Sequence, residues 1–399
     1  MKNRHIIRKN SLKYLPILLF SFFPYVTLYP VNSDIQPWCI LFVLVFSLLL
    51  FYKNTKFPSE ISPLWLPFMC SLGLLVVSSD ILSAIRSVFG YLTIGLVPFA
   101  FYFILKYEYD LFEKFIKITS IIYFIVGLVQ ILFYNQFMSF LLNRLSTSEN
   151  RGVTSLAPEP TFYGIICLFL ILIFLSLNIK NKYAYIYILL FQIFFLAQSS
   201  MTILFLIIFI FYYSIFKLNI KVVFFTLFGV MTVFTFLYNI DLASYNIRAI
   251  QLLNIFLEEP TNILIVDASV NDRVSAIYFS LKGFFDNYIL PNGFGTYTTY
   301  LSLELPKQTT FWWVSESNRI MSYYGSILFE LGFVGIVIPF TYSFIIFKAY
   351  KYKLRDFLLY LFFLNTILFS AIPLSFPFVG IYIATLLYKA KHETITCSQ

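Results

Sequence analysis

Charged residues are scarce in this chain, because Asp, Glu, Lys and Arg make up only 12% of its 399 residues. An ordinary soluble domain carries about 25%. Histidine is rarer still, with only His5 and His392, and the four cysteines form no Cys-x-x-Cys or Cys/His pattern. The shortage of charge excludes a soluble enzyme, a disordered chain and a coiled coil. The cysteine pattern excludes a disulfide framework and gives no support to a zinc site.

Hydrophobic residues fill the place of the missing charge, at 60% of the chain with a mean hydropathy of +0.82. A helix needs roughly 20 apolar residues to cross a bilayer. Runs of about that length occur at 14–31, 35–52, 63–79, 86–105, 115–134, 161–179, 183–198, 200–216, 219–238, 322–347, 357–371 and 372–388. We therefore predict an all-α polytopic membrane protein with about twelve transmembrane helices.

The basic residues predict how these helices are oriented. With the N-terminus inside and the spans alternating, most of the 28 Lys and Arg fall in short internal segments, as cytoplasmic loops require. Both termini are therefore expected in the cytoplasm, with residues 1–399 forming a single integral membrane domain. No small-residue cleavage site follows the basic N-terminus, so the first apolar run is interpreted as a span rather than a signal peptide.

Two hydrophilic segments are then left outside: a short loop at 135–160 and a large loop at 239–321, between the ninth and tenth spans. Each contains an amphipathic stretch. Apolar residues recur at helical spacing through 135–145 and again through 272–285, where Asp272 is placed to cap the helix. These short helices are expected to lie at the outer membrane interface.

The most specific external motif is RGVTSLAPEPTFYG at 151–164. It places Arg151 and Glu159 just before the sixth span, with Pro158 and Pro160 fixing the backbone on either side of the carboxylate. A carboxylate held at a membrane mouth can act as a base or orient a hydroxyl. Equally, Glu159 can serve only to favour the positive end of the sixth helix.

Two further motifs carry candidate site residues. In NDRVSAIYFSLKGFFDNYILPNGFGTY (271–297), Arg273 opens the amphipathic helix, and Gly293 and Gly295 lie in a tight turn. Glycines allow a ligand to approach the backbone closely, and they also simply make turns.

The third motif, SESNRIMSYYGSILFELGFVG (315–335), leads into the tenth span, with Glu316 and Arg319 at its mouth. Glu330 follows two to three turns further along, inside the hydrocarbon region. An intramembrane carboxylate indicates a functional site, or a hydrogen bond to a Ser, Tyr or Asn of a neighbouring helix.

Together these segments resemble the O-antigen polymerases of the Wzy type, within the wider group that includes O-antigen ligases. The resemblance covers the plan of some twelve spans with a large late outer loop. It also covers the R-x7-E-P-T stretch at Arg151, Glu159 and Pro160, the GFG turn that follows Arg273, and the GFVG sequence of the tenth span.

The resemblance implies a metal-independent glycosyltransferase without a cofactor. Its substrates would be oligosaccharide repeat units on polyprenyl pyrophosphate, joined at the outer face of the bacterial cytoplasmic membrane to build lipopolysaccharide O-antigen, capsule or another exopolysaccharide. A chain-length regulator in the membrane would be a partner, and nucleic acid would not.

The external cations fit this chemistry, because most of them are arginines, which bind phosphate oxygens bidentately and stay charged. Arg151, Arg273, Arg319 and Arg248 are the candidate pyrophosphate ligands. Gly293, Gly295 and Pro160 are assigned to the loops that hold the substrate.

One departure separates this chain from the ligases, whose pattern His-[Asn/Ser/Gln]-x9-Gly-x-x-Gly falls on Met321, Ser322, Gly332 and Gly335. The histidine is missing, so the role of base passes to a carboxylate: Glu159 first, then Glu316 or Asp272. A flippase or other transporter of lipid-linked sugars remains an alternative, as does a ligase. The large outer loop and the lack of internal repeats count against a transporter.

Overall fold

The computed structural model describes residues 12–29, 35–78, 80–134, 136–145, 152–217, 261–307, 320–351, 353–370 and 372–396, with a few isolated positions between 251 and 259. Within these ranges the regular structure is helical, apart from one isolated bridge between Val26 and Leu142. The predicted all-α class is therefore confirmed for the part of the chain that the structure describes.

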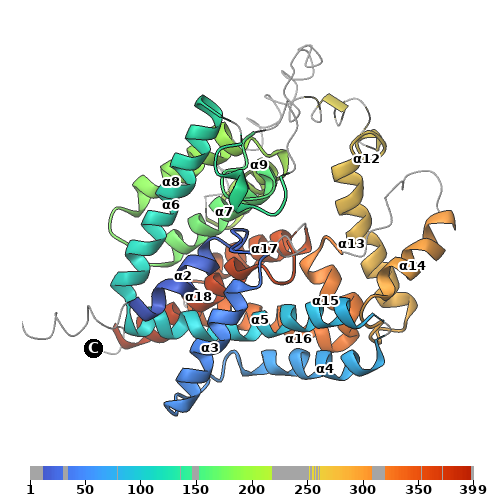
Figure 1. Cartoon of the computed structure of the whole chain (residues 1–399), viewed down its shortest axis with the longest axis horizontal. Helices are drawn as coiled ribbons and strands as arrows, with labels where there is room; N and C mark the ends of the chain where they lie inside the picture. The colour runs from blue at the N-terminus through green and yellow to red at the C-terminus, as the bar shows by residue number, and fades with distance from the viewer. Residues whose placement is uncertain are drawn as a thin grey trace, which may run out of the picture. The chain divides into compact units, whose positions relative to one another are not determined.

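Figure 1 shows how the helices follow one another along the chain. The first half contains α2 (Leu15–Phe22), α3 (Trp38–Tyr52), α4 (Trp65–Val77), α5 (Ile81–Tyr107), α6 (Tyr109–Leu132), α7 (Pro160–Ser176), α8 (Lys182–Phe191) and α9 (Ser200–Lys217). The second half contains α12 (Asn262–Val266), α13 (Ala268–Asp286), α14 (Thr296–Glu304), α15 (Tyr323–Leu331), α16 (Val337–Tyr350), α17 (Leu354–Phe369) and α18 (Pro377–Thr396). Two irregular turns matter below: the π-helical η4 (Gln192–Ala197) and the 3-10 turn η7 (Gly332–Ile336).

Four helical segments of the described chain are long and apolar enough to cross a membrane. They are Ile81–Tyr107, Tyr109–Leu132, Ser200–Lys217 and Tyr323–Tyr350, the last formed by α15, η7 and α16 together. They coincide with the predicted spans 86–105, 115–134, 200–216 and 322–347. Helices of this kind indicate a membrane protein. The count of about twelve spans stays a prediction, and the span predicted at 219–238 lies outside the described residues.

Two breaks between apolar runs fall where the sequence predicts them. Gln198 has a left-handed backbone (φ 45°) and separates η4 from α9. Near the C-terminus the runs 357–371 and 372–388 are predicted to separate near Pro373, and α17 ends at Phe369 while α18 begins at Pro377.

The first apolar run, predicted as a span over 14–31, is helical over a shorter stretch, because α2 ends at Phe22. Pro24 explains this end, since a proline disfavours helical backbone at the residue before it. Phe23 accordingly leaves the helix, with φ −122° and ψ 63°.

The prediction of an amphipathic helix within 135–145 is wrong. Only a 3-10 turn, η3 (Ser139–Leu141), forms there, and Met138 before it has a positive φ of 61°. The backbone N–H of Thr27 donates to the Leu141 carbonyl at 2.8 Å, and Leu142 pairs with Val26. Hydrogen bonds to a distant segment therefore override the helical spacing of the apolar residues, as tertiary contacts often override local propensity.

The chain forms two compact units. One comprises Met1–Ser62, Leu92–Leu204 and Ser375–Gln399. Its centre is α7, which is buried along nearly its whole length and packs against α8, η4 and α18. Helices α6 and α8 of the same unit run side by side (Figure 1). Aromatic rings fill this core, with Phe22 in contact with the rings of Phe101, Phe112 and Phe378.

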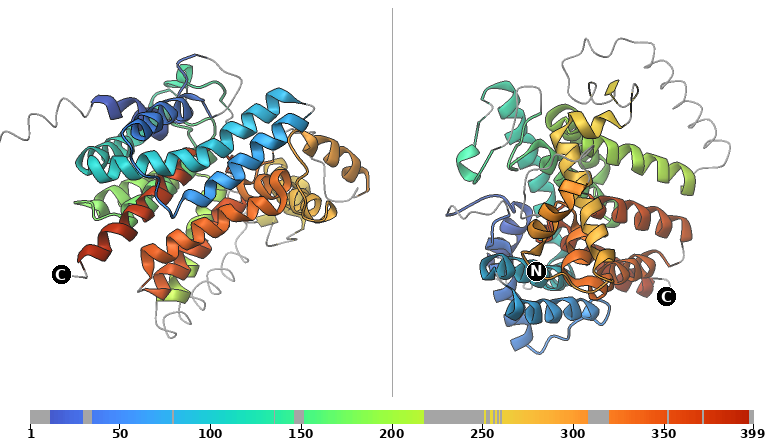
Figure 2. Two further views of the ribbon diagram at one scale, coloured as in Figure 1. Left: turned by 90° about the horizontal axis from the view of Figure 1, so that it is seen from below. Right: turned by 90° about the vertical axis from the view of Figure 1, so that its right-hand side faces the viewer.

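The other unit comprises Pro63–Tyr91 and Phe205–Leu374. Helix α13 packs on α15, as the yellow and orange ribbons of Figure 2 show, and α16 packs on α17. A buried cluster joins the hydrophilic helices α13 and α14 to α15 through Phe279, Tyr297, Leu301 and Phe329. The described part of the segment predicted as the large outer loop is therefore a folded helical layer with its own apolar core.

The helix predicted at 272–285 is confirmed as α13, but its predicted cap is wrong. The side chain of Asp267 accepts a hydrogen bond from the backbone N–H of Val270 at 2.9 Å and caps the helix. Asp272 lies one turn inside. The helix starts earlier than the apolar spacing indicates, because an N-cap carboxylate satisfies N–H groups that otherwise have no partner.

Candidate functional site

The turn Pro291–Gly295, between α13 and α14, is the most irregular part of the helical layer. Gly293 and Gly295 have φ angles of 81° and 74°, in the left-handed region that favours glycine. A Cβ atom on Gly293 would meet no heavy atom within 4 Å, so the backbone there is open to approach. The hydroxyl of Thr296 donates to the Asn292 carbonyl at 3.0 Å, which closes the turn onto α14.

The turn is bonded to the C-terminal end of α15. The backbone N–H groups of Asn292 and Gly293 donate to the carbonyls of Phe329 and Glu330, at 3.1 and 3.2 Å. These acceptors lie at the end of α15, where carbonyls lack partners within the helix. The helix ends because Gly332 is left-handed (φ 58°), and a Cβ on this glycine would lie 2.5 Å from the Ile289 carbonyl oxygen. The turn and the break in the helix therefore fit one another.

Glu330 lies beside the turn and joins it to α5. Its carboxylate accepts hydrogen bonds from Tyr91 Oη at 2.7 Å and from Ser87 Oγ at 3.2 Å. The Tyr91 ring contacts the ring of Phe294, which is 1% exposed, with their centroids 6.2 Å apart. Of the alternatives drawn from the sequence, the structure thus gives Glu330 the hydrogen bonds to Ser and Tyr, and it brings Glu330, Gly293 and Gly295 into one place.

Asp272 and Arg273 lie on the first turns of α13, in the same unit. Asp272 is partly buried, and burial raises the pKa of its carboxyl, an effect that neighbouring Arg273 partly offsets. Burial, together with the charge of Asp272, also raises the pKa of Tyr297 on α14. A carboxyl with a raised pKa is better suited to accept a proton near neutral pH than an ordinary aspartate.

An ionic cluster holds α14 against α13. Glu304 pairs with Lys282 and also with Lys307, at 2.6 Å, while the Tyr300 hydroxyl donates to Asp286 at 2.6 Å. The hydrogen bonds from Lys282 and Lys307 lower the pKa of Glu304. This cluster stabilises the helical layer that carries Arg273.

Glu159 and Pro160 lie in the other unit, at the start of α7. Glu159 is the N-cap residue, with Pro160 in the first turn, but its side chain makes no capping hydrogen bond. The carboxylate instead pairs with Arg144, whose Nη2 lies 3.4 Å from Oε1, and the two side chains are 16% and 48% exposed. Glu159 is thus a partly exposed carboxylate oriented by an arginine.

Four of the predicted site residues lie outside the described part of the chain: Glu316, Arg151, Arg248 and Arg319. The sequence does not single out two further residues of the described part, Arg144 and Gln130. Arg144 lies in the predicted external loop 135–160, and its position 15 residues before Glu159 gives no sign of a contact. Gln130, discussed below, lies near the end of an apolar run, where a lone amide is the one available signal.

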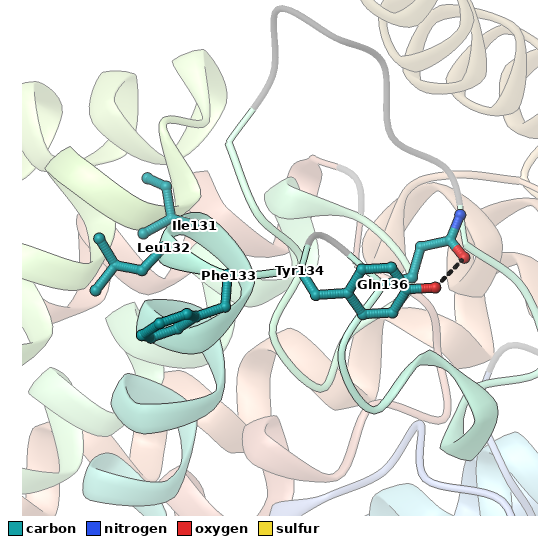
Figure 3. Close-up of a pocket in the computed structure, with 5 residues that line it drawn as sticks. All are labelled: Ile131, Leu132, Phe133, Tyr134 and Gln136. Carbon is teal, nitrogen blue, oxygen red and sulfur yellow. Dashed lines mark hydrogen bonds between the residues drawn. The ribbon is translucent and has the colours of Figure 1, made fainter.

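One pocket of the described part contains none of the predicted site residues. It is open, has a volume of about 390 Å³, and is lined by Ile131, Leu132, Phe133, Tyr134 and Gln136 (Figure 3). In it the Tyr134 hydroxyl donates to Gln136 Oε1 at 3.2 Å. Among the described residues, no group of three or more His, Cys, Asp or Glu side chains could hold a metal ion.

The chain matches no protein-family model, and no curated protein is significantly similar to it.

Proposed function

We propose that the protein is a polysaccharide repeat-unit polymerase of the Wzy type. The main supporting observation is the folded layer of α12–α14. In the chain this layer lies between the apolar helices α9 and α15, and the Pro291–Gly295 turn bonds it to the end of α15. A charged helical layer bonded to the end of a long apolar helix supports binding of a substrate that has a lipid tail and a polar head. The resemblance of the three sequence motifs to these polymerases supplies the substrate class.

The donor in this proposal is the growing sugar chain on polyprenyl pyrophosphate. Arg273, on α13, and Arg151, Arg248 and Arg319 bind the diphosphate and neutralise it as it leaves. The proposed enzyme is a glycosyltransferase that uses neither a metal ion nor a cofactor. Arginine suits this task because its guanidinium binds two phosphate oxygens at once and stays charged.

A carboxylate accepts the proton of the attacking hydroxyl. The oxygen at the nonreducing end of a new repeat unit forms a bond to the anomeric carbon, and the bond from that carbon to the diphosphate breaks. The leaving diphosphate keeps the electron pair, and the hydroxyl proton passes to Glu159. The ion pair with Arg144 supports this choice, since it orients the carboxylate. Asp272, with its raised pKa, is the second candidate and Glu316 the third.

The reaction takes place at the outer face of a bacterial cytoplasmic membrane. About twelve spans with both termini in the cytoplasm put the loops 135–160 and 239–321 on that face. The substrate comes from the membrane itself, and a chain-length regulator is a membrane partner. The product is O-antigen, capsule or another exopolysaccharide.

A transporter of lipid-linked sugars is the second candidate, and one observation favours it. Glu330 lies at the break between α15 and η7, inside a long apolar segment. Broken helices that carry polar groups form the substrate sites of many transporters. The two functions differ in where the unpolymerised repeat unit accumulates after gene deletion: outside for a polymerase, on the inner leaflet for a flippase.

Deletion of the gene, followed by gel analysis of the surface polysaccharide, tests the polymerase. We expect the long ladder to vanish and single repeat units to remain at the surface. Arg273→Ala should reproduce this loss, and Arg273→Lys should recover only part of the polymer, because lysine keeps the charge without the bidentate geometry. Arg355→Ala is the matched control, since Arg355 is exposed at the start of α17 and belongs to a predicted internal loop. Unchanged long chains after deletion would refute the proposal.

A further inference from the structure

The segment Gly152–Pro160, which leads to Glu159, contains a backbone conformation that its sequence does not favour. Ser155 has a φ angle of 51°, in the left-handed region, although it carries a Cβ atom. Residues other than glycine, asparagine and aspartate seldom adopt this conformation, so surrounding contacts must hold it. What holds Ser155 therefore also fixes the path of the chain toward Glu159.

The side-chain amide of Gln130, near the end of α6, holds Ser155 from both sides. The backbone N–H of Ser155 donates to Gln130 Oε1 at 2.7 Å, and Gln130 Nε2 donates to the Ser155 carbonyl at 3.1 Å. Both side chains are fully buried. Hydrogen bonds in such a water-free setting are costly to break, because neither partner can turn to solvent.

The same amide also holds the segment that carries Arg144. Gln130 Nε2 donates a second hydrogen bond, of 2.9 Å, to the carbonyl of Phe137. Phe137 lies in the irregular stretch that follows α6 and leads through η3 to Arg144, and Ser155 begins the turn that leads to Glu159. One buried side chain is therefore bonded to both segments that supply the Arg144–Glu159 pair.

Neighbouring contacts restrict the turn further. The Ser155 hydroxyl donates to the Tyr123 carbonyl at 2.9 Å, and the Val153 N–H donates to the Leu196 carbonyl of η4 at 2.8 Å. A Cβ atom on Gly152 would lie 2.2 Å from the Ala197 carbonyl oxygen, so only glycine fits there. The segment has little room to move, which is the property a catalytic carboxylate requires of its support.

From these contacts we infer that Gln130 is a positioning residue, whose amide sets the geometry of the Arg144–Glu159 pair by fixing Ser155 and Phe137. This inference rests on the proposed polymerase function, because it assigns to Gln130 an effect on the reaction that Glu159 performs. Gln130 itself does not bind the substrate.

The test uses the full-length protein in the deletion strain and measures polymer formed per molecule of protein in the membrane fraction. Gln130→Met keeps the volume of the side chain and removes its hydrogen bonds. We expect a loss between about tenfold and a hundredfold, since a misplacement of about 1 Å has effects of this size. Tyr342→Phe is the control for the loss of a buried hydrogen bond. The Tyr342 side chain is 1% exposed and its hydroxyl is bonded to that of Tyr323 at 2.8 Å, with both residues in the unit that does not contain Gly152–Pro160, so its variant should keep wild-type polymer per molecule.

A double-variant comparison separates positioning from general stability. Glu159→Asp retracts the carboxylate by one methylene and lowers activity by itself. If Gln130 acts through Glu159, then Gln130→Met combined with Glu159→Asp should lose much less than the product of the two single losses. Independent losses that multiply would overturn the inference.

A second pair of variants tests the backbone conformation without touching Gln130. Ser155→Gly can keep φ near 51°, whereas Ser155→Val disfavours it, because a β-branched residue is strained there. We expect clearly more polymer per molecule from the glycine variant than from the valine variant, and equal amounts would overturn the inference. Failure of the deletion itself to remove long chains would refute the proposed function instead, so the two failures are distinguishable.

Discussion

Replacing Gly332 with alanine tests whether the Pro291–Gly295 turn depends on the break at the end of α15. The glycine has a φ of 58°, and a Cβ atom there would lie 2.5 Å from the Ile289 carbonyl oxygen and 2.6 Å from the Pro291 nitrogen. Both neighbours are backbone atoms, so the clash cannot be relieved by rotating a side chain. The segment 289–293 must move away from α15 instead.

The expected cost has two parts. With φ 58° and ψ −138°, Gly332 adopts a conformation that is almost confined to glycine, and a residue with a Cβ pays roughly 1–3 kcal/mol for it. Moving the segment also weakens three backbone hydrogen bonds, which join Phe333 to Ile289, Asn292 to Phe329 and Gly293 to Glu330. At about 1 kcal/mol for each bond, the free energy of unfolding should fall by roughly 4–6 kcal/mol in total.

Thermal unfolding of the purified full-length protein in detergent measures this loss. Gly73→Ala is the matched control, because Gly73 lies inside α4 of the same unit, and a Cβ there would meet nothing within 4 Å. Alanine should stabilise that helix by about 0.5–1 kcal/mol. Unfolding of Gly332→Ala at the wild-type temperature, or an equal destabilisation of Gly73→Ala, would show that the turn does not depend on the glycine.

Three further predictions concern the same unit. Tyr91→Phe keeps the ring contact with Phe294 but removes the hydrogen bond to Glu330. Thermal unfolding should therefore show a loss of stability of about 1.5–3 kcal/mol. Tyr52→Phe is the control, and it should have no effect because Tyr52 is exposed. Asp267→Ala should lower the free energy of unfolding by about 1 kcal/mol, because it removes the cap of α13. Asp272→Ala is the comparison, since Asp272 does not cap the helix. Equal losses of stability in both variants would contradict the assignment of the cap to Asp267. Because its partners lower the pKa of folded Glu304 below the ordinary 4.5, the cluster stabilises the protein above that pH and loses this contribution as the pH falls through the folded pKa. The raised pKa of Lys282 sets the other limit, since its contribution is lost as the pH rises above 10.5. Glu304→Gln should therefore unfold with a weaker dependence on acid pH than the wild type, and an identical dependence would show that Glu304 does not contribute.

The apolar helices follow from the sequence because hydrophobicity is a local property. The runs at 86–105, 115–134 and 200–216 became α5, α6 and α9 with boundaries shifted by a few residues. The 272–285 helix could be predicted for the same reason, since its apolar residues recur on one face. Glycine in the 291–295 segment also indicated the turn correctly, because positive φ angles are a local requirement.

Contacts between distant segments could not be read in this way. The helical spacing of 135–145 was overridden by its pairing with residues 26 and 27, which lie more than a hundred positions away. The cap of α13 was placed at the wrong aspartate, because the apolar spacing marks the buried face of a helix and not its first residue. Glu330 was identified as unusual, but its partners on α5 depend on how two helices pack.

The sequence by itself determined that this is a helical protein with segments suited to a membrane, and it marked the glycines, arginines and carboxylates where chemistry is expected. Hydrophobic runs, and the positive φ angles that favour glycine, are properties of single residues and short segments. They can therefore be recognised without knowing which distant residues they contact. Only the tertiary structure decided that Gln130 is bonded to both segments of the Arg144–Glu159 pair and that the glycine turn fits the break in α15. These are hydrogen bonds between residues far apart in the chain, and they exist only once packing has excluded water and brought the partners together.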